Sequence, residues 1–283
     1  MFKKRMLGLF RLFRFELPLT AGVCVILGEL LALGTFPTTA EIVLGFLSFF
    51  FISAAALILN DYFDLETDKI NALEMPLPAG LVTGSDVILL SIAVTILGFI
   101  TGYLIGFEAL LAVVLVWAVG FLYNWRFKKA GFIGNLMVSF SVGMTFIFGG
   151  ITVDRPFEII VWFFAITVSL INLGEEIAAD AMDIEGDRKA GTRSLALVFG
   201  REKALKISGA IFLLVVAAGS LPFLLGWLEL IYLFPILLMN AVILYSTSKL
   251  LDSRIVNRRI YIRWIYLSGL VAFLIFIIIR MVR

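Results

Sequence analysis

Two short stretches of the chain carry aspartates at a spacing that suits metal binding. They are Asp61, Asp64 and Asp68 in the first stretch and Asp180, Asp183 and Asp187 in the second. In both, the aspartates lie three and then four residues apart, so on a helix they would share one face. Asn60 adds an amide oxygen to the first stretch. Hard oxygen ligands of this kind favour Mg²⁺, which keeps some of its water and binds substrate phosphates.

The two stretches also repeat one another. A shift of 119 residues superposes the aspartates, and it places Glu66 on Glu185 and Lys69 on Arg188. We therefore expect an internal pseudo-repeat of residues 60–69 and 179–188 that forms two facing acidic ledges. Such ledges repel each other unless cations lie between them, so we expect Mg²⁺ to bridge a diphosphate and neutralise its developing charge.

The composition identifies the setting in which this chemistry takes place. Of the 283 residues, 61% are hydrophobic and 16% are charged. Soluble domains have about 45–50% apolar residues and about 25% charged residues. A net charge of +2 with no basic domain argues against nucleic-acid binding. The absence of histidine excludes Ser-His-Asp and Cys-His catalysis and histidine-ligated zinc. The sequence predicts an integral membrane enzyme that relies on carboxylates, amides and a hard metal ion.

Apolar runs long enough to cross a bilayer, which takes about 20 residues each, recur along the whole chain. We predict an all-α integral membrane protein, residues 1–283 as a single domain, with nine transmembrane helices in a bundle around a central cavity. The predicted spans are 17–36, 41–60, 85–106, 108–124, 132–152, 157–175, 204–225, 227–248 and 262–280. Four spans separate the two acidic stretches, so both should reach the same side of the membrane.

The basic residues predict the orientation of these spans. With a cytoplasmic N-terminus, 20 of the 23 Lys and Arg residues fall in cytoplasmic segments and three, Arg155, Arg280 and Arg283, fall outside. This is the asymmetry that the positive-inside rule describes. We expect a multi-pass protein of the cell membrane with both acidic stretches, and hence the active site, on the cytoplasmic side.

The motifs resemble those of a known family. Residues 60–68 fit the pattern NDxxDxxxD, the first signature of the UbiA superfamily of intramembrane prenyltransferases. Residues 180–195, with Gly191 and a Ser194-Leu195 pair, resemble its second signature. The stretch Pro76–Gly80 and the segment from Tyr123 to Asn135 also resemble family patterns. Together with the nine-span topology, the resemblance covers essentially the whole chain.

The resemblance implies Mg²⁺-dependent transfer of an isoprenyl chain from an allylic prenyl diphosphate, of geranyl to geranylgeranyl length, to a lipophilic acceptor in the bilayer. It implies catalytic roles for Asp61, Asp64, Asp180 and Asp183. The implied metal ligands are Asn60, Asp64, Asp68, Glu176, Asp180, Asp183 and Asp187. As substrate-binding residues we expect Arg14, Tyr62, Lys69, Tyr123, Lys128, Lys129, Asn135 and Arg188.

Departures from the family pattern leave the acceptor open. The digeranylgeranylglyceryl phosphate synthase branch usually carries cationic or polar side chains where this chain has Ala72, Met75, Glu175, Ala179 and Met182. Cationic side chains there would suit a phosphorylated acceptor. Both geranylgeranylglyceryl phosphate and an aromatic or quinone precursor, as in menaquinone- and vitamin-K-type relatives, therefore stay candidates.

Two other classes of protein use comparable acidic residues. A cation-coupled secondary transporter could use paired acidic sites, but transporters place them near the bilayer midplane, whereas these stretches lie at span ends beside basic loops. A CDP-alcohol phosphotransferase carries one glycine-interleaved aspartate cluster, whereas this chain has two separated clusters. The prenyltransferase is the favoured hypothesis and the transporter is its alternative.

Overall fold

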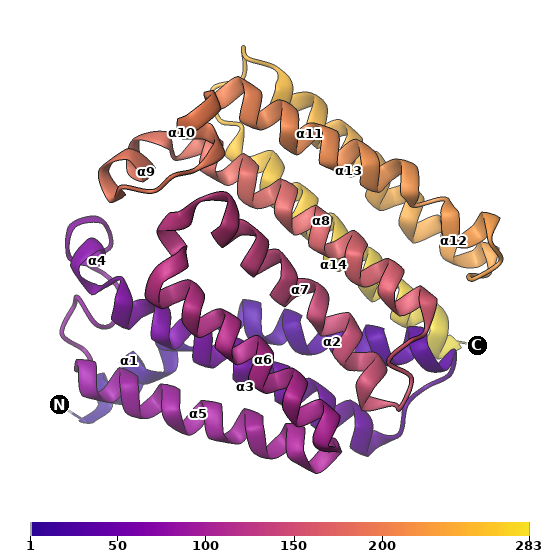
Figure 1. Ribbon diagram of the computed structural model, residues 1–283, viewed down its shortest axis with the longest axis horizontal. Coiled ribbons are helices and arrows are strands. Elements are labelled where there is room, and N and C mark those ends of the chain that lie inside the picture. Colours follow the sequence, from indigo (N-terminus) through magenta and orange to yellow (C-terminus); the bar gives the residue numbers. More distant parts are fainter. Residues whose placement is uncertain (1, 283) are drawn as a thin grey trace. The chain divides into compact units, whose positions relative to one another are not determined.

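The computed structural model describes residues 2–282, without the side chains of residues 2, 70 and 71, and all of its regular structure is helical (Figure 1). In this described part, nine helical stretches are long and apolar enough to cross a membrane. They are Glu16–Leu33, Thr39–Phe63, Gly84–Ile105, Phe107–Ala130, Phe132–Thr152, Ile159–Met182, Arg201–Leu224, Leu230–Leu251 and Arg259–Val282. The all-α membrane fold with nine spans is confirmed, while the side on which the N-terminus lies stays a prediction.

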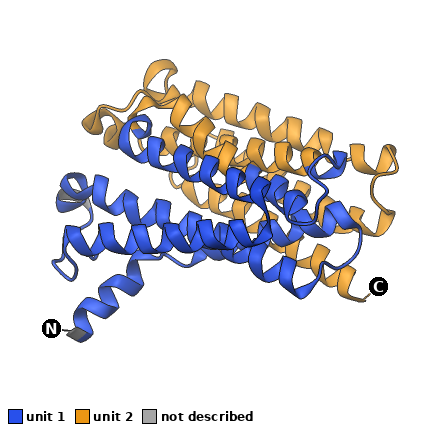
Figure 2. Ribbon diagram, turned by 60° about the horizontal axis from the view of Figure 1, so that its bottom comes forward, with its two compact units in different colours: residues 1–128, 144–161 blue, residues 129–143, 162–283 orange. Residues whose placement is uncertain are grey.

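The chain divides into two compact units, and each is described by itself (Figure 2). Unit 1 comprises residues 1–128 and 144–161, and unit 2 comprises residues 129–143 and 162–283. The helices that lie wholly in unit 1 are α1 (Phe2–Leu12), α2 (Glu16–Leu33), α3 (Thr39–Phe63), α4 (Leu65–Asn71), α5 (Gly84–Ile105), α6 (Phe107–Leu122) and the π-helix η1 (Tyr123–Phe127). Helix α3 packs against α2, α5 and α6.

Local sequence signals define where two of these helices begin. Thr38 accepts a hydrogen bond from the backbone N–H of Glu41 (3.3 Å), and the Glu41 carboxylate accepts one from the Thr38 N–H (2.6 Å). Thr83 and Asp86 form the same reciprocal pair at the start of α5. Such capping boxes satisfy backbone donors that the helix leaves unpaired, so they determine where α3 and α5 start.

Helix α7 (Phe132–Thr152) has residues in both units, and its later residues approach α2 closely within unit 1. A Cβ atom on Gly149 would overlap the Val25 carbonyl oxygen and lie 2.7 Å from the Glu29 backbone nitrogen. Small residues allow membrane helices to pack backbone to backbone. Gly149 therefore permits this contact, and so does Gly28 of α2, where a Cβ atom would overlap the Phe146 carbonyl oxygen.

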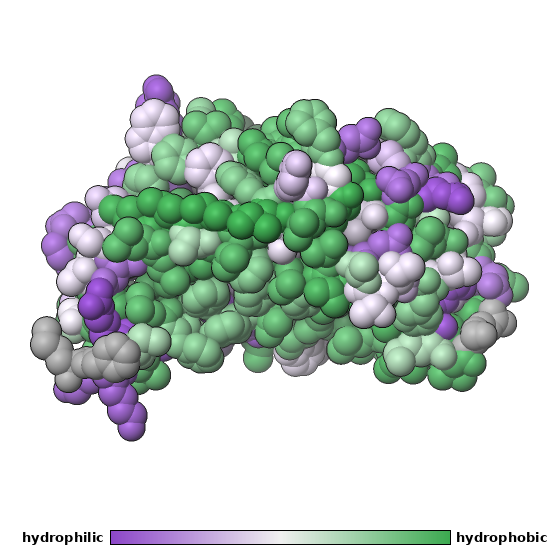
Figure 3. Space-filling model, turned by 90° about the horizontal axis from the view of Figure 1, so that it is seen from below, coloured by the Kyte–Doolittle hydropathy of each residue, from purple (hydrophilic) through white to green (hydrophobic). Residues whose placement is uncertain are grey.

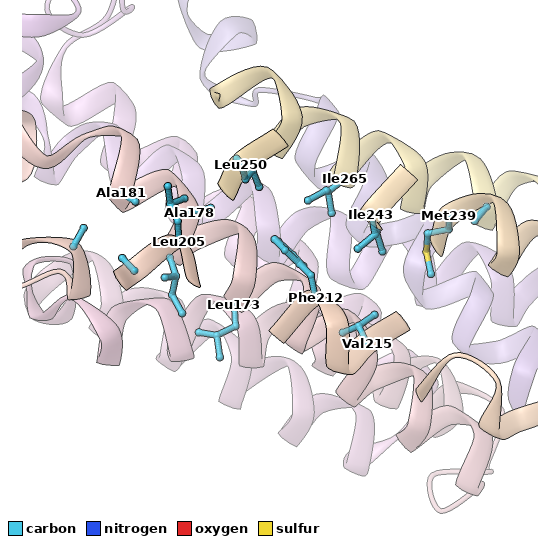
Figure 4. Close-up of a cluster of buried hydrophobic side chains, with 14 residues drawn as sticks. Leu173, Ala178, Ala181, Leu205, Phe212, Val215, Met239, Ile243, Leu250 and Ile265 are labelled. Atoms are coloured by element: carbon cyan, nitrogen blue, oxygen red, sulfur yellow. The ribbon is translucent and has the colours of Figure 1, made fainter. Parts of the chain in front are cut away.

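Unit 2 holds the remaining helices. They are α8 (Ile159–Met182), which begins in unit 1, α9 (Ile184–Ala190), α10 (Leu195–Phe199), α11 (Arg201–Ala218), α12 (Leu221–Leu224), η3 (Leu230–Tyr232), α13 (Leu233–Leu251) and α14 (Arg259–Val282), and the short η2 (Lys128–Ala130) borders the unit. Figure 4 shows Leu173, Phe212, Ile243 and Ile265 of α8, α11, α13 and α14 in one core cluster. The Phe212 ring lies against Gly174, where a Cβ atom would be 2.7 Å from its Cε1 atom.

The exposed surface of the spans is apolar, as a lipid-facing surface must be. On α5, for example, the side chains of Leu89, Ile92 and Ile96 are 65%, 51% and 50% exposed. Figure 3 shows apolar side chains over the middle of the viewed face and hydrophilic ones gathered toward its two ends.

Candidate functional site

The two acidic motifs share one backbone design. Helix α3 ends at Phe63, Asp64 forms a junction, and the short helix α4 follows from Leu65. Likewise α8 ends at Met182, Asp183 forms the junction, and α9 follows from Ile184. Every one of these boundaries obeys the 119-residue shift. The structure thus differs from the continuous helical stripe expected from the spacing, because the helix is interrupted at the middle aspartate of each motif.

The junctions have a simple backbone explanation. Asp183 (φ −118°, ψ 24°) lies outside the helical region, and Asp64 (φ −89°, ψ 0°) stays right-handed but with a ψ far from that of a regular helix. Aspartate readily leaves the helix because its side chain competes for local backbone groups. A new helical turn restarts at once, since the Asp68 N–H bonds to the Asp64 carbonyl (2.8 Å) and the Asp187 N–H to the Asp183 carbonyl (2.9 Å). The outer aspartates of each motif therefore lie on different helices, joined by the middle one.

Asp61 is the buried carboxylate of the first motif, with 1% of its surface exposed. Arg14, in the turn between α1 and α2, donates a hydrogen bond to its Oδ1 atom, whereas Oδ2 has no hydrogen-bond partner. A buried carboxylate is costly unless it is paired. The predicted substrate residue Arg14 is thus the ion-pair partner of the predicted catalytic residue Asp61.

Asp64 lies in a network that also contains an amide and an ammonium group. Lys128 donates to Asp64 Oδ2, and the Asn60 amide fits with its nitrogen 2.9 Å from Asp64 Oδ2 and its oxygen 2.9 Å from Lys128 Nζ. Asn60 also contacts the side chain of Asn124 (2.8 Å), and Asn124 donates to the Ala56 carbonyl (2.9 Å). The structure therefore brings together Asn60, Asp64 and Lys128, as the sequence suggested.

Asn124 is the residue of this network that the sequence analysis missed. It is 8% exposed and lies in η1, a single π-helical turn that precedes Lys128. Such turns occur frequently at functional sites. Its position next to Tyr123, within the segment that resembles the family pattern, is the signal that could have identified it.

The other predicted residues around the first motif lie farther out. Lys69 pairs with Glu66 (2.6 Å) on exposed α4. Tyr62 is 39% exposed and lies beside the start of α5, where a Cβ atom on Gly84 would be 3.5 Å from its ring. Burial raises the pKa of Asp68, and the neighbouring Asp64 carboxylate raises it further. A nearby cation would therefore stabilise the charged form of Asp68.

In the second motif, Asp180 and Asp183 have different partners. Asn135 of α7, which is 7% exposed, donates to Asp180 Oδ2 (2.9 Å), so these two predicted site residues are in contact. Arg259 at the start of α14 lies 3.6 Å from Asp183 Oδ2. A Cβ atom on Gly186 would be 3.0 Å from Asp183 Oδ1, so a glycine there leaves room for the carboxylate over α9.

Asp187 closes the second motif. Burial raises its pKa, the Ser194 side chain opposes this effect, and the Asp183 carboxylate adds to it. One of its oxygens, Oδ2, has no hydrogen-bond partner. Glu176 lies close enough to Asp180 for the two carboxylates to repel each other, whereas Lys129 and Arg188 are exposed.

The donor set fits Mg²⁺ only if the substrate supplies further ligands. Within the described residues, no three Asp, Glu or Cys side chains converge on one point, so no cage made of protein alone is present there. Mg²⁺ usually binds one or two carboxylates, keeps water, and takes the rest of its oxygens from phosphate groups. The buried, unpartnered Oδ2 atoms of Asp61 and Asp187 and the amide of Asn60 are oxygen donors of the required kind.

Comparison with known proteins identifies the family. The model of the UbiA prenyltransferase family matches residues 21–267. The chain belongs to the UbiA prenyltransferase family. It is therefore a multi-pass membrane prenyltransferase, and this decides between the enzyme and the transporter that the acidic residues alone left open.

Curated relatives within this family are digeranylgeranylglyceryl phosphate synthases. The chain is 35% identical to the synthase of Thermococcus kodakarensis over 237 residues, which are 83% of this chain and 84% of the relative. It is 33% identical to that of Methanothermobacter thermautotrophicus over 239 residues, or 83% of each chain.

Solved structures share the fold. A structure described as that of digeranylgeranylglyceryl phosphate synthase in membranes superposes with a TM-score of 0.80 at 27% identity, covering 97% of this chain and 98% of that one. A UbiA homologue from Archaeoglobus fulgidus, solved with DMAPP and Mg²⁺, superposes with a TM-score of 0.73 at 21% identity, covering 92% of this chain and 98% of that one. At that identity the second likeness concerns the fold alone.

Proposed function

We propose that the protein transfers an isoprenyl group from an allylic prenyl diphosphate to a lipophilic acceptor, with Mg²⁺ as cofactor. The observation that carries this proposal is the pair of acidic motifs with the same helix–junction–helix arrangement in a chain of this family. Bound Mg²⁺ would neutralise the negative charge that develops on the departing diphosphate.

We assign two ions to the two motifs. Asn60, Asp64 and Asp68 would hold one, and Asp180, Asp183 and Asp187, with Glu176 beside them, the other. The interruption of both helices supports this assignment, because each junction aspartate joins a long helix to the short helix that carries the third aspartate of the same motif. Asp61 supports the first set from its buried position beside Arg14.

Lys128 is the basic residue best placed to bind the diphosphate. Its ammonium group contacts Asp64 and the Asn60 amide, so it could donate hydrogen bonds to a diphosphate that these residues would hold through Mg²⁺. Hydrogen bonds from an ammonium to phosphate are charge-assisted and strong. Lys69, by contrast, faces Glu66 on the exposed side of α4, and it contributes less.

An aromatic row in unit 1 offers a path for the prenyl chain. Starting beside the first motif, Phe63 contacts Phe121 (6.2 Å between ring centroids), Phe121 contacts Trp117 (5.6 Å), and Trp117 contacts Phe99 (5.8 Å). Such rings are apolar and keep water away. They also stabilise a positive charge through their π faces, which suits the allylic cation left when diphosphate departs.

For the acceptor, we propose geranylgeranylglyceryl phosphate first, because the curated relatives are digeranylgeranylglyceryl phosphate synthases. A second candidate is an acceptor without phosphate, such as an aromatic quinone precursor. The sequence of α8 favours it: Gly174–Met182 contains no basic residue, and Glu175, which is not among the assigned Mg²⁺ ligands, would repel a phosphate monoester. Arg263 of α14, which acts electrostatically on Glu175, partly offsets this repulsion.

An acceptor panel tests the proposal. Purified protein in lipid is incubated with labelled geranylgeranyl diphosphate, Mg²⁺ and either geranylgeranylglyceryl phosphate, a hydroxybenzoate or a dihydroxynaphthoate. Product with the first acceptor alone supports the first candidate, and product with an aromatic acceptor supports the second. If no acceptor yields product and the diphosphate is not consumed, the proposed activity is wrong.

We further propose that the N-terminus and both motifs lie on the cytoplasmic side, because 20 of the 23 basic residues fall in segments that would share that side. Single cysteines in the Cys24→Ala background test this with an impermeant thiol reagent on intact cells. A cysteine at Ser253, between α13 and α14, should be protected until the cells are opened, and labelling in intact cells would reverse the orientation.

A further inference from the structure

Helix α1 has one face that is anchored on unit 1. Leu12 is fully buried, and a Cβ atom on Gly8 would be 2.8 Å from Val82 Cγ1. Arg5 pairs with Asp86, the capping residue at the start of α5. These residues recur every three or four positions, as one face of a helix requires, and they hold α1 against the end of α5.

The remaining surface of α1 is apolar and exposed. Met6, Leu7 and Phe10 are 50%, 56% and 61% exposed, and Met6 and Phe10 lie one turn apart on the same side. Lys3 and Lys4 are exposed as well. The helix, FKKRMLGLFRL, contains four basic residues and no acidic one. It therefore combines a second apolar face with a strongly cationic surface, which is the pattern of a helix that lies in a membrane interface.

The placement of α1 agrees with that pattern. It contacts α3, the start of α5, where Asp86 lies, and the loop before α5, which includes Glu74 and Val82. Figure 2 shows α1 leading away from the other helices of its unit, close to the N-terminus. A helix that leaves the spans at their end lies at the depth of the lipid headgroups, where apolar side chains reach the acyl chains and lysines reach phosphates.

We propose that the face of α1 formed by Met6, Leu7 and Phe10, together with Lys3 and Lys4, binds the interfacial region of an anionic lipid surface. The charge of α1 favours anionic lipid as its partner, because a cationic helix without acidic residues attracts negatively charged headgroups. The same charge would repel a second copy of the helix. This inference goes beyond the proposed prenyl transfer and does not depend on it.

The position of a probe on α1 tests the proposal in the full-length protein. Cys24 is the one cysteine of the chain and is buried, so Met6→Cys in a Cys24→Ala background carries a single nitroxide label. The protein is reconstituted in nanodiscs of phosphatidylcholine alone or mixed with phosphatidylglycerol. Depth is read from the accessibility of the label to oxygen, which enters the bilayer, and to a water-soluble nickel chelate.

We expect the label to lie in the interface and to move deeper when phosphatidylglycerol is present. Lys3→Gln/Lys4→Gln should abolish that dependence, since each lysine near an anionic surface changes the partition by about fivefold. The matched control, Lys203→Gln/Lys206→Gln, removes two exposed lysines from α11 and should leave the depth unchanged. A label at Asn257, an exposed loop position, serves as the reference for full exposure to water.

Three results overturn the proposal. A label as accessible to the nickel chelate as the one at Asn257 means that α1 lies in water. A label shielded from both quenchers means that a protein surface, such as a second copy, covers this face. An interfacial depth that ignores phosphatidylglycerol and the lysine substitutions removes the anionic-lipid part of the proposal. Because the readout is depth, each result stands whether or not the protein turns over a prenyl diphosphate.

Discussion

Arg14 donates a hydrogen bond to the buried carboxylate of Asp61, and so it connects the turn after α1 to the first acidic motif. The turn is unusual, because Arg14 adopts a positive φ of 44°, and its neighbours Phe13 and Phe15 stack on each other (5.2 Å) and contact Phe50 of α3. The aromatic contacts hold the backbone in a conformation that points the guanidinium at Asp61.

The Arg14–Asp61 pair should contribute to the stability of unit 1. Arg14→Met leaves a buried carboxylate without its partner, so we expect a lower unfolding temperature in detergent, whereas Asp61→Asn should lower it less. The double variant should recover part of the loss, with a coupling energy of about 0.5–3 kcal/mol, as for other contacting pairs. Strictly additive effects in this double-mutant cycle would show that the pair does not stabilise the protein.

Two adjacent lysines should differ in their importance for turnover. Lys128 contacts Asp64 and Asn60, whereas Lys129 is exposed. Loss of a hydrogen bond to a charged group costs about 1.5–3 kcal/mol, so Lys128→Gln should lower kcat/KM for the prenyl diphosphate by about 10- to 100-fold. Lys129→Gln is the matched control and should change kcat/KM for the prenyl diphosphate by less than about threefold. Equal effects of the two substitutions would contradict the proposed role of Lys128.

Gly131 should tolerate no side chain. Its φ is +63°, and a Cβ atom there would overlap the carbonyl oxygen of Arg193. Gly226 has a similar φ of +70° with nothing within 4 Å of a Cβ atom. Gly226→Ala should therefore cost only the left-handed conformation, about 1–2 kcal/mol, and Gly131→Ala distinctly more. Thermal unfolding in detergent measures both, and equal losses would mean that the contact with Arg193 is unimportant.

Much of this architecture can be predicted from the sequence, and the predictions that were wrong have physical causes. Apolar length alone predicts the nine spans, because the bilayer determines helix length. It places the end of the second span at residue 60 and that of the sixth at 175, yet α3 runs to Phe63 and α8 to Met182. Hydropathy falls where the acids begin, whereas the helical hydrogen bonds continue until Asp64 and Asp183. Spacing therefore identified the carboxylates but not the junctions between them.

The partners of the acids were harder to predict than the acids themselves. Arg14–Asp61 joins residues 47 positions apart, and Lys128–Asp64 joins residues 64 apart. Spacing rules describe neighbours within one helix and say nothing of such pairs. The resemblance to a family pattern named Lys128 and Asn135 as site residues, and the structure adds the carboxylate that each one contacts.

Metal removal should abolish binding of the diphosphate group. With Mg²⁺ present, inorganic diphosphate should raise the unfolding temperature, since a ligand at 100 times its Kd stabilises the folded state by about 2.7 kcal/mol. In EDTA the shift should disappear, and it should return when Mg²⁺ is added in excess. An undiminished shift in EDTA would mean that basic side chains alone bind diphosphate and that the two motifs do not work through a metal.

The central claim, that both acidic motifs perform metal-dependent prenyl transfer, is tested most directly by matched substitutions in each. Asp64→Asn and Asp183→Asn alter the junction residues, while Glu66→Gln and Glu185→Gln alter the exposed acids two positions later. With labelled geranylgeranyl diphosphate and saturating Mg²⁺, we predict that each aspartate variant loses activity by about a hundredfold or more. Each glutamate variant should stay close to the unmodified protein. Normal turnover in either aspartate variant would contradict the account.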